Sequence, residues 1–263
     1  MSAFLSALWV ENLKARRSKV PWLTALGFSL APLMGGLFMI ILKNPEKALS
    51  MGFIGAKARL LTAGVADWPT YFQLLIMSTA IGGALLFAII TAWVFGREFS
   101  DHTAKELLAL PTPREVIVSA KFAIIAAWAA GLTVLIFAIG LGVGAAVSLP
   151  GWSTEIAWKV GGDLMTIAVL NIALMPPVAL FASAGRGYLP PLGWAIFTLF
   201  LAQVLSMMGW ASWFPWSVPA MLSQLAGPQA EQLGLHSYVS VALACAAGLA
   251  VTYAWWRNAD QTE

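Results

Sequence analysis

Charged residues are scarce in this chain: they make up 10% of its 263 residues, whereas 60% are hydrophobic. A soluble domain carries about 25% charged residues, so the composition excludes an ordinary soluble domain and predicts that lipid surrounds much of the protein. The only cysteine, Cys245, excludes an intrachain disulfide. No block of like charges favours nucleic-acid binding, and we expect no nucleic-acid partner.

Sequence motifs for catalysis are missing as well. The chain contains no G-x-x-x-x-G-K-[ST] loop to cradle a nucleotide phosphate, no H-E-x-x-H and no G-x-S-x-G. Its two histidines, His102 and His236, fall on opposite sides of the membrane in the predicted topology, so they cannot share a metal ion. We therefore expect no catalytic residue, no metal site and no cofactor in this chain.

Long apolar stretches dominate the chain instead. A membrane-spanning helix needs about 20 mostly apolar residues, and six stretches meet this requirement. They lie at about 21–42, 72–95, 115–148, 160–184, 189–208 and 237–256. We predict an all-α polytopic membrane protein with six transmembrane helices, which form a single transmembrane domain over residues 1–263.

Glycine and proline mark two of the spans. Gly140, Gly142 and Gly144 give the third span a small-residue spacing that permits close helix approach. Pro176-Pro177 should kink or break the fourth span. For both features, ordinary helix packing is favoured over the alternative of a gating role.

Asp163 is the exception to the lack of polar groups in the spans. It lies one turn into the fourth predicted span, and a carboxylate in a membrane is costly enough to mark a candidate intramembrane polar site. The alternative is that Asp163 caps a helix or lies among headgroup water near the outer edge. An intramembrane enzyme would need a larger polar constellation than this single residue.

The distribution of Lys and Arg predicts the orientation, because cytoplasmic segments carry an excess of these residues. With six spans both termini share one side, and ten of the fifteen basic residues fall there. They are Lys14, Arg16, Arg17, Lys19, Arg97, Lys105, Arg114, Lys121, Arg186 and Arg257. The other side holds Lys43, Lys47, Lys57, Arg59 and Lys159. We therefore expect both termini in the cytoplasm.

Two segments outside the spans are predicted to lie at the membrane surface. Within residues 2–19, apolar side chains gather near one helical face opposite the charges, which favours an interfacial helix over a plain cytoplasmic tail. These side chains are Phe4, Leu5, Leu8, Trp9 and Leu13. The segment 208–236 opens with three Trp, a Phe and two Pro, which predicts an outer interfacial or re-entrant segment.

The connection at 97–121 is more elaborate than a turn requires. Thr103 and Glu106 form a T-x-x-E capping box that opens a short helix at about 101–110, and Pro111 must end it.

A second helix start follows at once. Thr112 is the predicted cap, Pro113 the first helical residue, and Glu115 the acid of the first turn.

The short helix at about 101–110 has an apolar side and charged flanks. The apolar residues are Leu107, Leu108 and Leu110, and the charged ones include Arg97, Lys105 and Arg114. Such a helix is either a docking surface or a solvated loop helix that packs on its own protein.

At this connection the chain resembles the permease subunits of bacterial ABC-2 type exporters, in particular the bacitracin and lantibiotic self-resistance permeases and related multidrug exporters. The resembling residues are Arg97-Glu98-Phe99, Thr103, Glu106-Leu107-Leu108, Leu110-Pro111, Arg114 and Lys121. One departure is Asp101-His102, where the family often has Gly before the Thr. The layout of interfacial helix, coupling helix and outer segment is similar to that of type V exporters over the whole chain.

The resemblance implies a permease subunit, without enzyme activity of its own, in the bacterial plasma membrane. It would move an amphipathic substrate, such as a peptide antibiotic, a drug or a lipid-like molecule, out of the cytoplasm or inner leaflet. A separate ABC ATPase dimer, which holds ATP and Mg, would dock on the coupling helix. A second permease copy, identical or related, and membrane lipids are the other implied partners. The implied coupling residues are Arg97, Glu98, Thr103, Lys105, Glu106, Leu107, Leu108, Leu110 and Arg114.

The competing hypothesis is a non-transporting polytopic membrane protein, such as an assembly factor or a sensor partner. Such a protein would lack an ATPase gene beside its own and would show no ATP-dependent flux.

Overall fold

Helices make up the regular structure of this protein. The computed structural model describes residues 2–44, 65–103, 106–107, 111–223 and 233–258. Six helical spans there are long and apolar enough to cross a membrane, which confirms the predicted number and order. They are α2 (Val20–Lys43), Trp68–Ser100, α7 (Arg114–Ala146), Thr154–Ala184, α10 (Leu189–Met207) and α12 (Leu235–Asn258). One more helix, α1 (Ala3–Arg17), precedes them.

Two of the spans are interrupted. The second consists of α4 (Trp68–Ser78), the π-helical segment η2 (Thr79–Gly83) and α5 (Ala84–Ser100). The fourth consists of α8 (Thr154–Ala173) and α9 (Met175–Ala184). This break confirms the prediction made from Pro176-Pro177, because proline lacks an N–H donor and its ring clashes with the preceding turn.

Two of the spans begin earlier than hydropathy predicted, because a capping residue starts each of them. Asp67 Oδ1 accepts a hydrogen bond from the backbone N–H of Thr70 at 2.9 Å, so α4 begins at Trp68 rather than near residue 72. Ser153 caps α8 in the same way, so that helix begins at Thr154 rather than near residue 160. Asp163 consequently lies about 14 Å along the axis from the start of α8. The prediction that it lies one turn into the span was wrong.

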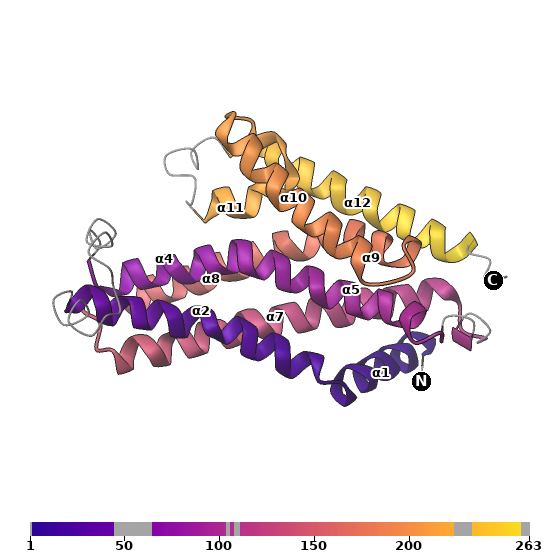
Figure 1. The fold of residues 1–263 in the computed structure, drawn as a ribbon, viewed down its shortest axis with the longest axis horizontal. Helices are drawn as coiled ribbons and strands as arrows, with labels where there is room; N and C mark the ends of the chain where they lie inside the picture. The colour runs from indigo at the N-terminus through magenta and orange to yellow at the C-terminus, as the bar shows by residue number, and fades with distance from the viewer. Residues whose placement is uncertain (1, 45–64, 104–105, 108–110, 224–232, 259–263) are drawn as a thin grey trace.

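The spans run back and forth along one long axis (Figure 1). One end of the bundle holds α1, the end of α5, the start of α7, the α9–α10 turn and the end of α12. We call it the α1 end. The end of α2, the start of α4 and the α7–α8 turn lie at the opposite end. The first and last described helices therefore meet the same face of the membrane, as an even number of crossings requires.

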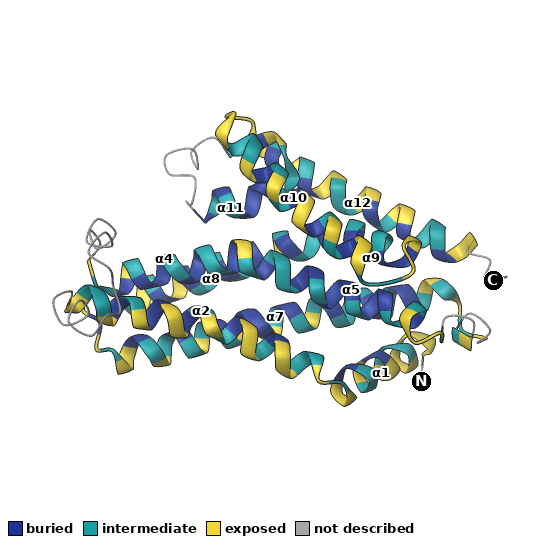
Figure 2. Ribbon diagram, viewed as in Figure 1, coloured by how far each residue is buried: buried dark blue, intermediate teal, exposed yellow. Residues whose placement is uncertain are grey.

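Apolar side chains cover the outside of the bundle as well as its interior. Tyr71 and Phe87 are wholly buried between the helices, whereas Trp22 and Leu26 on α2 are 74% and 66% exposed. Figure 2 shows exposed residues along the outer faces of several spans. Water would penalise so large an apolar surface, whereas lipid tails match it. The burial pattern thus supports a membrane-embedded bundle.

Glycines let α7 approach α4 closely. A side-chain carbon at Gly144 would overlap the ring of Trp68, and one at Gly140 would overlap Leu75. The same carbon at Gly142 would meet no atom within 4 Å. The small-residue spacing therefore serves helix packing at two of its three positions.

The segment after α10 folds back onto the bundle (Figure 1). It contains two 3-10 turns, Ala211–Trp213 and Pro215–Ser217, and the short helix α11 (Val218–Leu222). The side-chain amide of Gln73 on α4 donates a hydrogen bond to the carbonyl of Ser223. This arrangement agrees with an interfacial or re-entrant segment, whose depth in the membrane stays a prediction. Residues 224–232 of the predicted segment lie outside the described residues.

Candidate functional site

Helix α1 turns Glu11 and Lys14 toward the bundle and several of its apolar side chains outward. Ser2 caps the helix and accepts from the backbone N–H of Leu5 at 3.4 Å. Trp9 is 60% exposed, whereas Glu11 is buried. A helix in water would face the opposite way. Exposed apolar side chains on α1 agree with the predicted interfacial helix, because lipid can cover them.

The inward side of α1 contributes two charges to a buried ion network at the α1 end. Glu11 Oε1 and Glu98 Oε1 each accept from Lys14 Nζ, at 2.9 and 2.7 Å. Lys121 Nζ on α7 donates to Glu98 Oε1 at 2.8 Å and to Glu11 Oε2 at 3.2 Å. It also donates to the Val94 carbonyl at 2.9 Å. We call Glu11, Lys14, Glu98 and Lys121 the ionic cluster.

The ionic cluster is neutral in sum and largely closed to solvent. The Lys121 side chain is fully buried, and those of Glu98 and Glu11 are 3% and 7% exposed. Charges removed from water must find partners, or the desolvation cost exceeds the attraction. Burial lowers the pKa of Lys14, but the carboxylates of Glu11 and Glu98 outweigh this effect and hold its pKa above the usual value. The Lys14 ammonium therefore stays charged at neutral pH, and the cluster joins α1, α5 and α7.

Glu98 also holds the connection that leaves α5. Its second carboxylate oxygen, Oε2, accepts from the hydroxyl of Thr103 at 2.9 Å, and its carbonyl accepts from the Thr103 N–H at 2.9 Å. The Thr103 carbonyl in turn accepts from the N–H of Leu107 at 3.0 Å, which forms a helical turn. The predicted capping box paired Thr103 with Glu106, but among the described residues these two exchange no capping hydrogen bond. The Thr103 hydroxyl bonds to Glu98 instead.

His102 explains why the family motif often has glycine at this point. Its φ of 58° lies in the left-handed region, where L side chains are strained and glycine is favoured. The turn closes with the His102 N–H bonded to the Phe99 carbonyl at 3.2 Å, the pattern of a helix C-terminus. The chain keeps the turn of the motif although it lacks the glycine.

The other predicted coupling residues lie around this turn. Arg97 bonds to Asp101 through Nε at 3.0 Å and lies over the ring of Trp93, 5.1 Å from its centre. Glu106 is exposed, whereas Leu107 is half-buried against the core of its own chain. Lys105, Leu108 and Leu110 lie outside the described residues.

The structure changes two expectations about this connection. Glu98 was expected to flank a docking surface, and it is instead buried among the lysines of its own chain. Thr112 was expected to cap α7, but Pro113 occupies the cap position without a side-chain hydrogen bond, so that prediction was wrong. The proline carbonyl accepts from the N–H of Val116 at 2.9 Å. Arg114 donates to the carbonyls of Trp256 and Arg257 at the end of α12, both at 3.2 Å.

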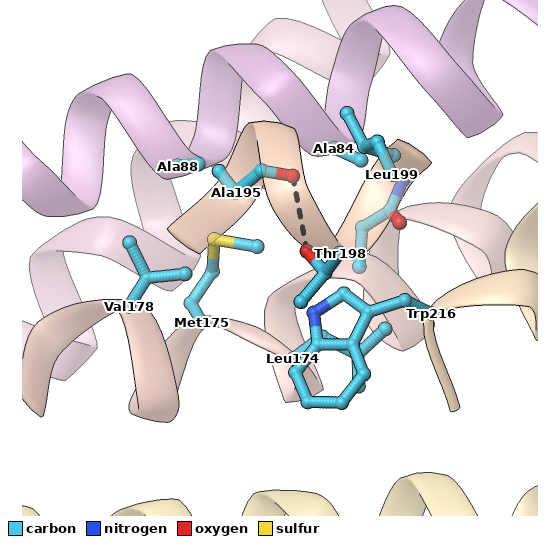
Figure 3. Close-up of a pocket in the computed structure, with 10 residues that line it drawn as sticks. Ala84, Ala88, Leu174, Met175, Val178, Ala195, Thr198, Leu199 and Trp216 are labelled. Carbon is cyan, nitrogen blue, oxygen red and sulfur yellow. Dashed lines mark hydrogen bonds between the residues drawn. The ribbon is translucent and has the colours of Figure 1, made fainter. Parts of the chain in front are cut away.

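A second polar feature lies halfway along the bundle. The π-helical segment η2 frees backbone carbonyls, and the side-chain amide of the buried Asn171 on α8 donates to those of Thr79 and Ala80, at 3.1 and 3.3 Å. Beside it lies a cavity of about 20 Å³, room for about one water molecule. Figure 3 shows Trp216 of the outer segment against this cavity. Interruptions of this kind recur at functional sites, but this cavity is too small for a substrate.

Sequence reasoning missed three members of these sites. Glu11 and Lys14 looked like the solvated face of an amphipathic helix, and Asn171 looked like an ordinary residue of an apolar span. The sequence signal for Asn171 is a polar amide at membrane depth, where an unpaired group costs several kcal/mol. Asp163 is half-buried on α8, and among the described residues no salt bridge includes it.

A six-span bundle with a structured connection at one end and no nucleotide motif has the form of a transport permease. The chain belongs to the ABC-2 family of transporter proteins, whose family profile matches residues 7–202. It is therefore a permease subunit of a transporter, and members of this family are transport components rather than enzymes. The match includes the whole ionic cluster.

A named relative is the bacitracin transport permease protein BCRB of Bacillus licheniformis. It is 27% identical to this chain over 199 residues, which cover 74% of this chain and 90% of the relative. No solved structure matches the chain.

Proposed function

We propose that this permease works in an ATP-driven exporter, with a separate ABC ATPase dimer bound at the connection around residues 101–110. The observation that supports the proposal most strongly is the double role of Glu98. One oxygen of its carboxylate binds Lys14 and Lys121, and the other binds Thr103 of the connection. A force on the connection therefore reaches α1 and α7 through a single buried side chain.

The surface of the connection suits a docking partner. Glu106 is exposed and Arg97 is partly exposed, so both can orient an approaching subunit by charge. Leu108 and Leu110 supply apolar anchors in this proposal, whereas Leu107 stabilises the connection against the permease core. Nucleotide and Mg would bind on the ATPase, because this chain has no phosphate-binding loop.

The proposed cargo is an amphipathic molecule, moved out of the cytoplasm or inner leaflet. The name of the relative, a bacitracin transport permease, favours a peptide antibiotic, and amphipathic drugs or lipid-like molecules are the other candidates. The exporter would contain two permease copies, identical or related. The excess of Lys and Arg at the α1 end favours a cytoplasmic location for that end in a bacterial plasma membrane.

Co-purification with a candidate ABC ATPase subunit tests the docking surface. We expect Glu106→Lys to reduce the ATPase retained on tagged permease at least fivefold, because reversing an exposed interface charge makes approach unfavourable. Glu155→Lys is the matched control, since Glu155 is also exposed but lies at the opposite end of the bundle.

Equal retention by both variants and by the wild type would contradict docking at this connection. Leu108→Ala adds a second test, and we expect it to weaken retention by about 1–3 kcal/mol, the range of an interface anchor.

A further inference from the structure

Two adjoining pockets lie at the α1 end, outside the ionic cluster. The first is an apolar groove of about 370 Å³ between α2, α5 and the start of α10. Its walls include Leu23, Leu86, Ile89, Trp93 and Leu192. The volume falls in the range of small-ligand sites, about 300–1,000 Å³.

The second pocket is smaller and basic. It has a volume of about 280 Å³ and lies between the end of α1 and the end of α5. Lys14, Arg17 and Arg97 line it. The contact between the Arg97 guanidinium and the Trp93 ring joins the two pockets, because Trp93 lines the groove and Arg97 the basic pocket.

The basic pocket has positive charge that the protein itself does not neutralise. Lys14 is paired with two glutamates, and the Nε of Arg97 is paired with Asp101. The other end of the Arg97 guanidinium, Nη1, is buried without a hydrogen-bond partner among the described residues. Arg17 is exposed, and in the described part of the chain no carboxylate forms a salt bridge with it. An anion placed here would be attracted by both guanidinium groups.

The two pockets together have the length of one membrane leaflet. Arg97 and Leu86 lie on the same helix, so they are separated by about 16 Å along its axis. Half of a bilayer's hydrocarbon core is about 15 Å thick. The basic pocket would therefore lie at headgroup level when the groove lies among acyl chains.

We infer that these pockets hold one anionic phospholipid of the leaflet at the α1 end. The headgroup phosphate accepts hydrogen bonds from Arg17 and is attracted by the positive charge of Arg97, and one acyl chain lies in the groove against Trp93 and Leu23. The lipid would stabilise α1 against α2 and α5. The inference does not depend on an ATPase or on the identity of the cargo.

Native mass spectrometry of the purified full-length protein in detergent tests this inference, with phosphatidylglycerol as the probe. We expect one retained phosphatidylglycerol and at least fivefold less phosphatidylcholine. Arg17→Gln should lower retention about fivefold, the effect of one basic residue near a charged surface. Its matched control is Arg16→Gln, since Arg16 is exposed on the same helix but does not line the pocket.

A second pair of variants tests the groove. Leu23→Trp fills it and should lower retention, whereas Leu26→Trp lies one turn further along the same lipid-facing side and should not. Both wild-type residues are similarly exposed, so the two variants cost similar stability.

Four outcomes would overturn the inference. Equal retention of phosphatidylcholine would show no headgroup recognition, and equal losses in Arg16→Gln and Arg17→Gln would show diffuse attraction. Displacement of phosphatidylglycerol by millimolar inorganic phosphate would identify a site for free phosphate. Loss of a permease dimer in Leu23→Trp, with lipid retention unchanged, would identify the groove as an interface between two copies of the chain.

Discussion

Lys121 shows how a single buried charge can bind three helices together. Its ammonium lies where no water reaches it, and every partner it has in the described structure comes from α1 or α5. Removing one member of a buried ion pair leaves the others uncompensated, which costs more than the pair itself contributes.

Replacing Lys121 by Met should therefore destabilise the protein by about 3–5 kcal/mol. The double variant Glu98→Gln/Lys121→Met should recover most of this loss, because it leaves Glu11 and Lys14 as a balanced pair. Thermal unfolding in detergent, followed by tryptophan fluorescence, measures both effects. Lys19→Met is the control for an exposed lysine, expected within about 0.5 kcal/mol of the wild type. Equal stability of the single variant and the control would refute a structural role for the cluster.

His102 gives a second prediction at the residue scale. Its left-handed backbone is open to glycine but strongly disfavours β-branched side chains. We expect His102→Gly to fold as well as the wild type and His102→Val to lose about 1–2 kcal/mol. The same unfolding assay distinguishes them, and a His102→Val variant as stable as His102→Gly would show that the turn does not need this conformation.

The sequence identified members of the candidate site only where they belong to a recognisable motif. Glu98 and Lys121 belonged to the family pattern, but their pairing with α1 could not be predicted, because it depends on how α1 rotates about its axis. Amphipathic periodicity assigns the apolar face of a helix to a protein core in water. In a membrane the same pattern allows the opposite rotation, which α1 adopts.

Helix packing at the level of elements depends on two glycines of α7. Gly144→Ala should lower stability, since the added carbon overlaps the buried ring of Trp68, and overpacking costs about 1–3 kcal/mol. Gly142→Ala adds the same carbon where no atom lies within 4 Å, and it should be neutral or stabilising by up to about 1 kcal/mol. The midpoints of unfolding of the two variants settle this comparison. A Gly144→Ala midpoint at or above that of Gly142→Ala would contradict the close approach of α7 to α4.

Hydropathy located all six spans, and proline located the break between α8 and α9. Hydropathy could not locate the first residue of a helix whose capping residue lies outside the apolar run, as Asp67 and Ser153 show. The π-helical segment η2 was not predicted either, and the hydrogen bonds of its carbonyls with Asn171 on α8 are a tertiary contact that hydropathy does not reveal.

Lys and Arg are more frequent at the α1 end of the molecule than at the opposite end, which predicts that the α1 end faces the cytoplasm. In a variant without Cys245, a cysteine at Ser100 should be protected from a membrane-impermeant thiol reagent in intact cells, and a cysteine at Glu155 should be labelled. Both wild-type residues are exposed, at opposite ends of the bundle. Lysed cells provide the control in which both positions react. Labelling of Ser100→Cys but not Glu155→Cys in intact cells would reverse the topology.

The central claim at the scale of the whole molecule is that the ionic cluster transmits the motion of an ATPase to the spans. The charge-balanced variant Glu98→Gln/Lys121→Met separates transmission from folding, because it removes the link between the connection and α7 without leaving a lone buried charge.

The most direct test is the ATP hydrolysis rate of the reconstituted permease–ATPase pair, with and without bacitracin. If the proposed function is correct, the wild-type pair should hydrolyse ATP faster when bacitracin, the candidate substrate, is present. The double variant should retain the ATPase in co-purification within about twofold of the wild type and should lose the stimulation. Full stimulation in a folded, ATPase-bound double variant would contradict the claim.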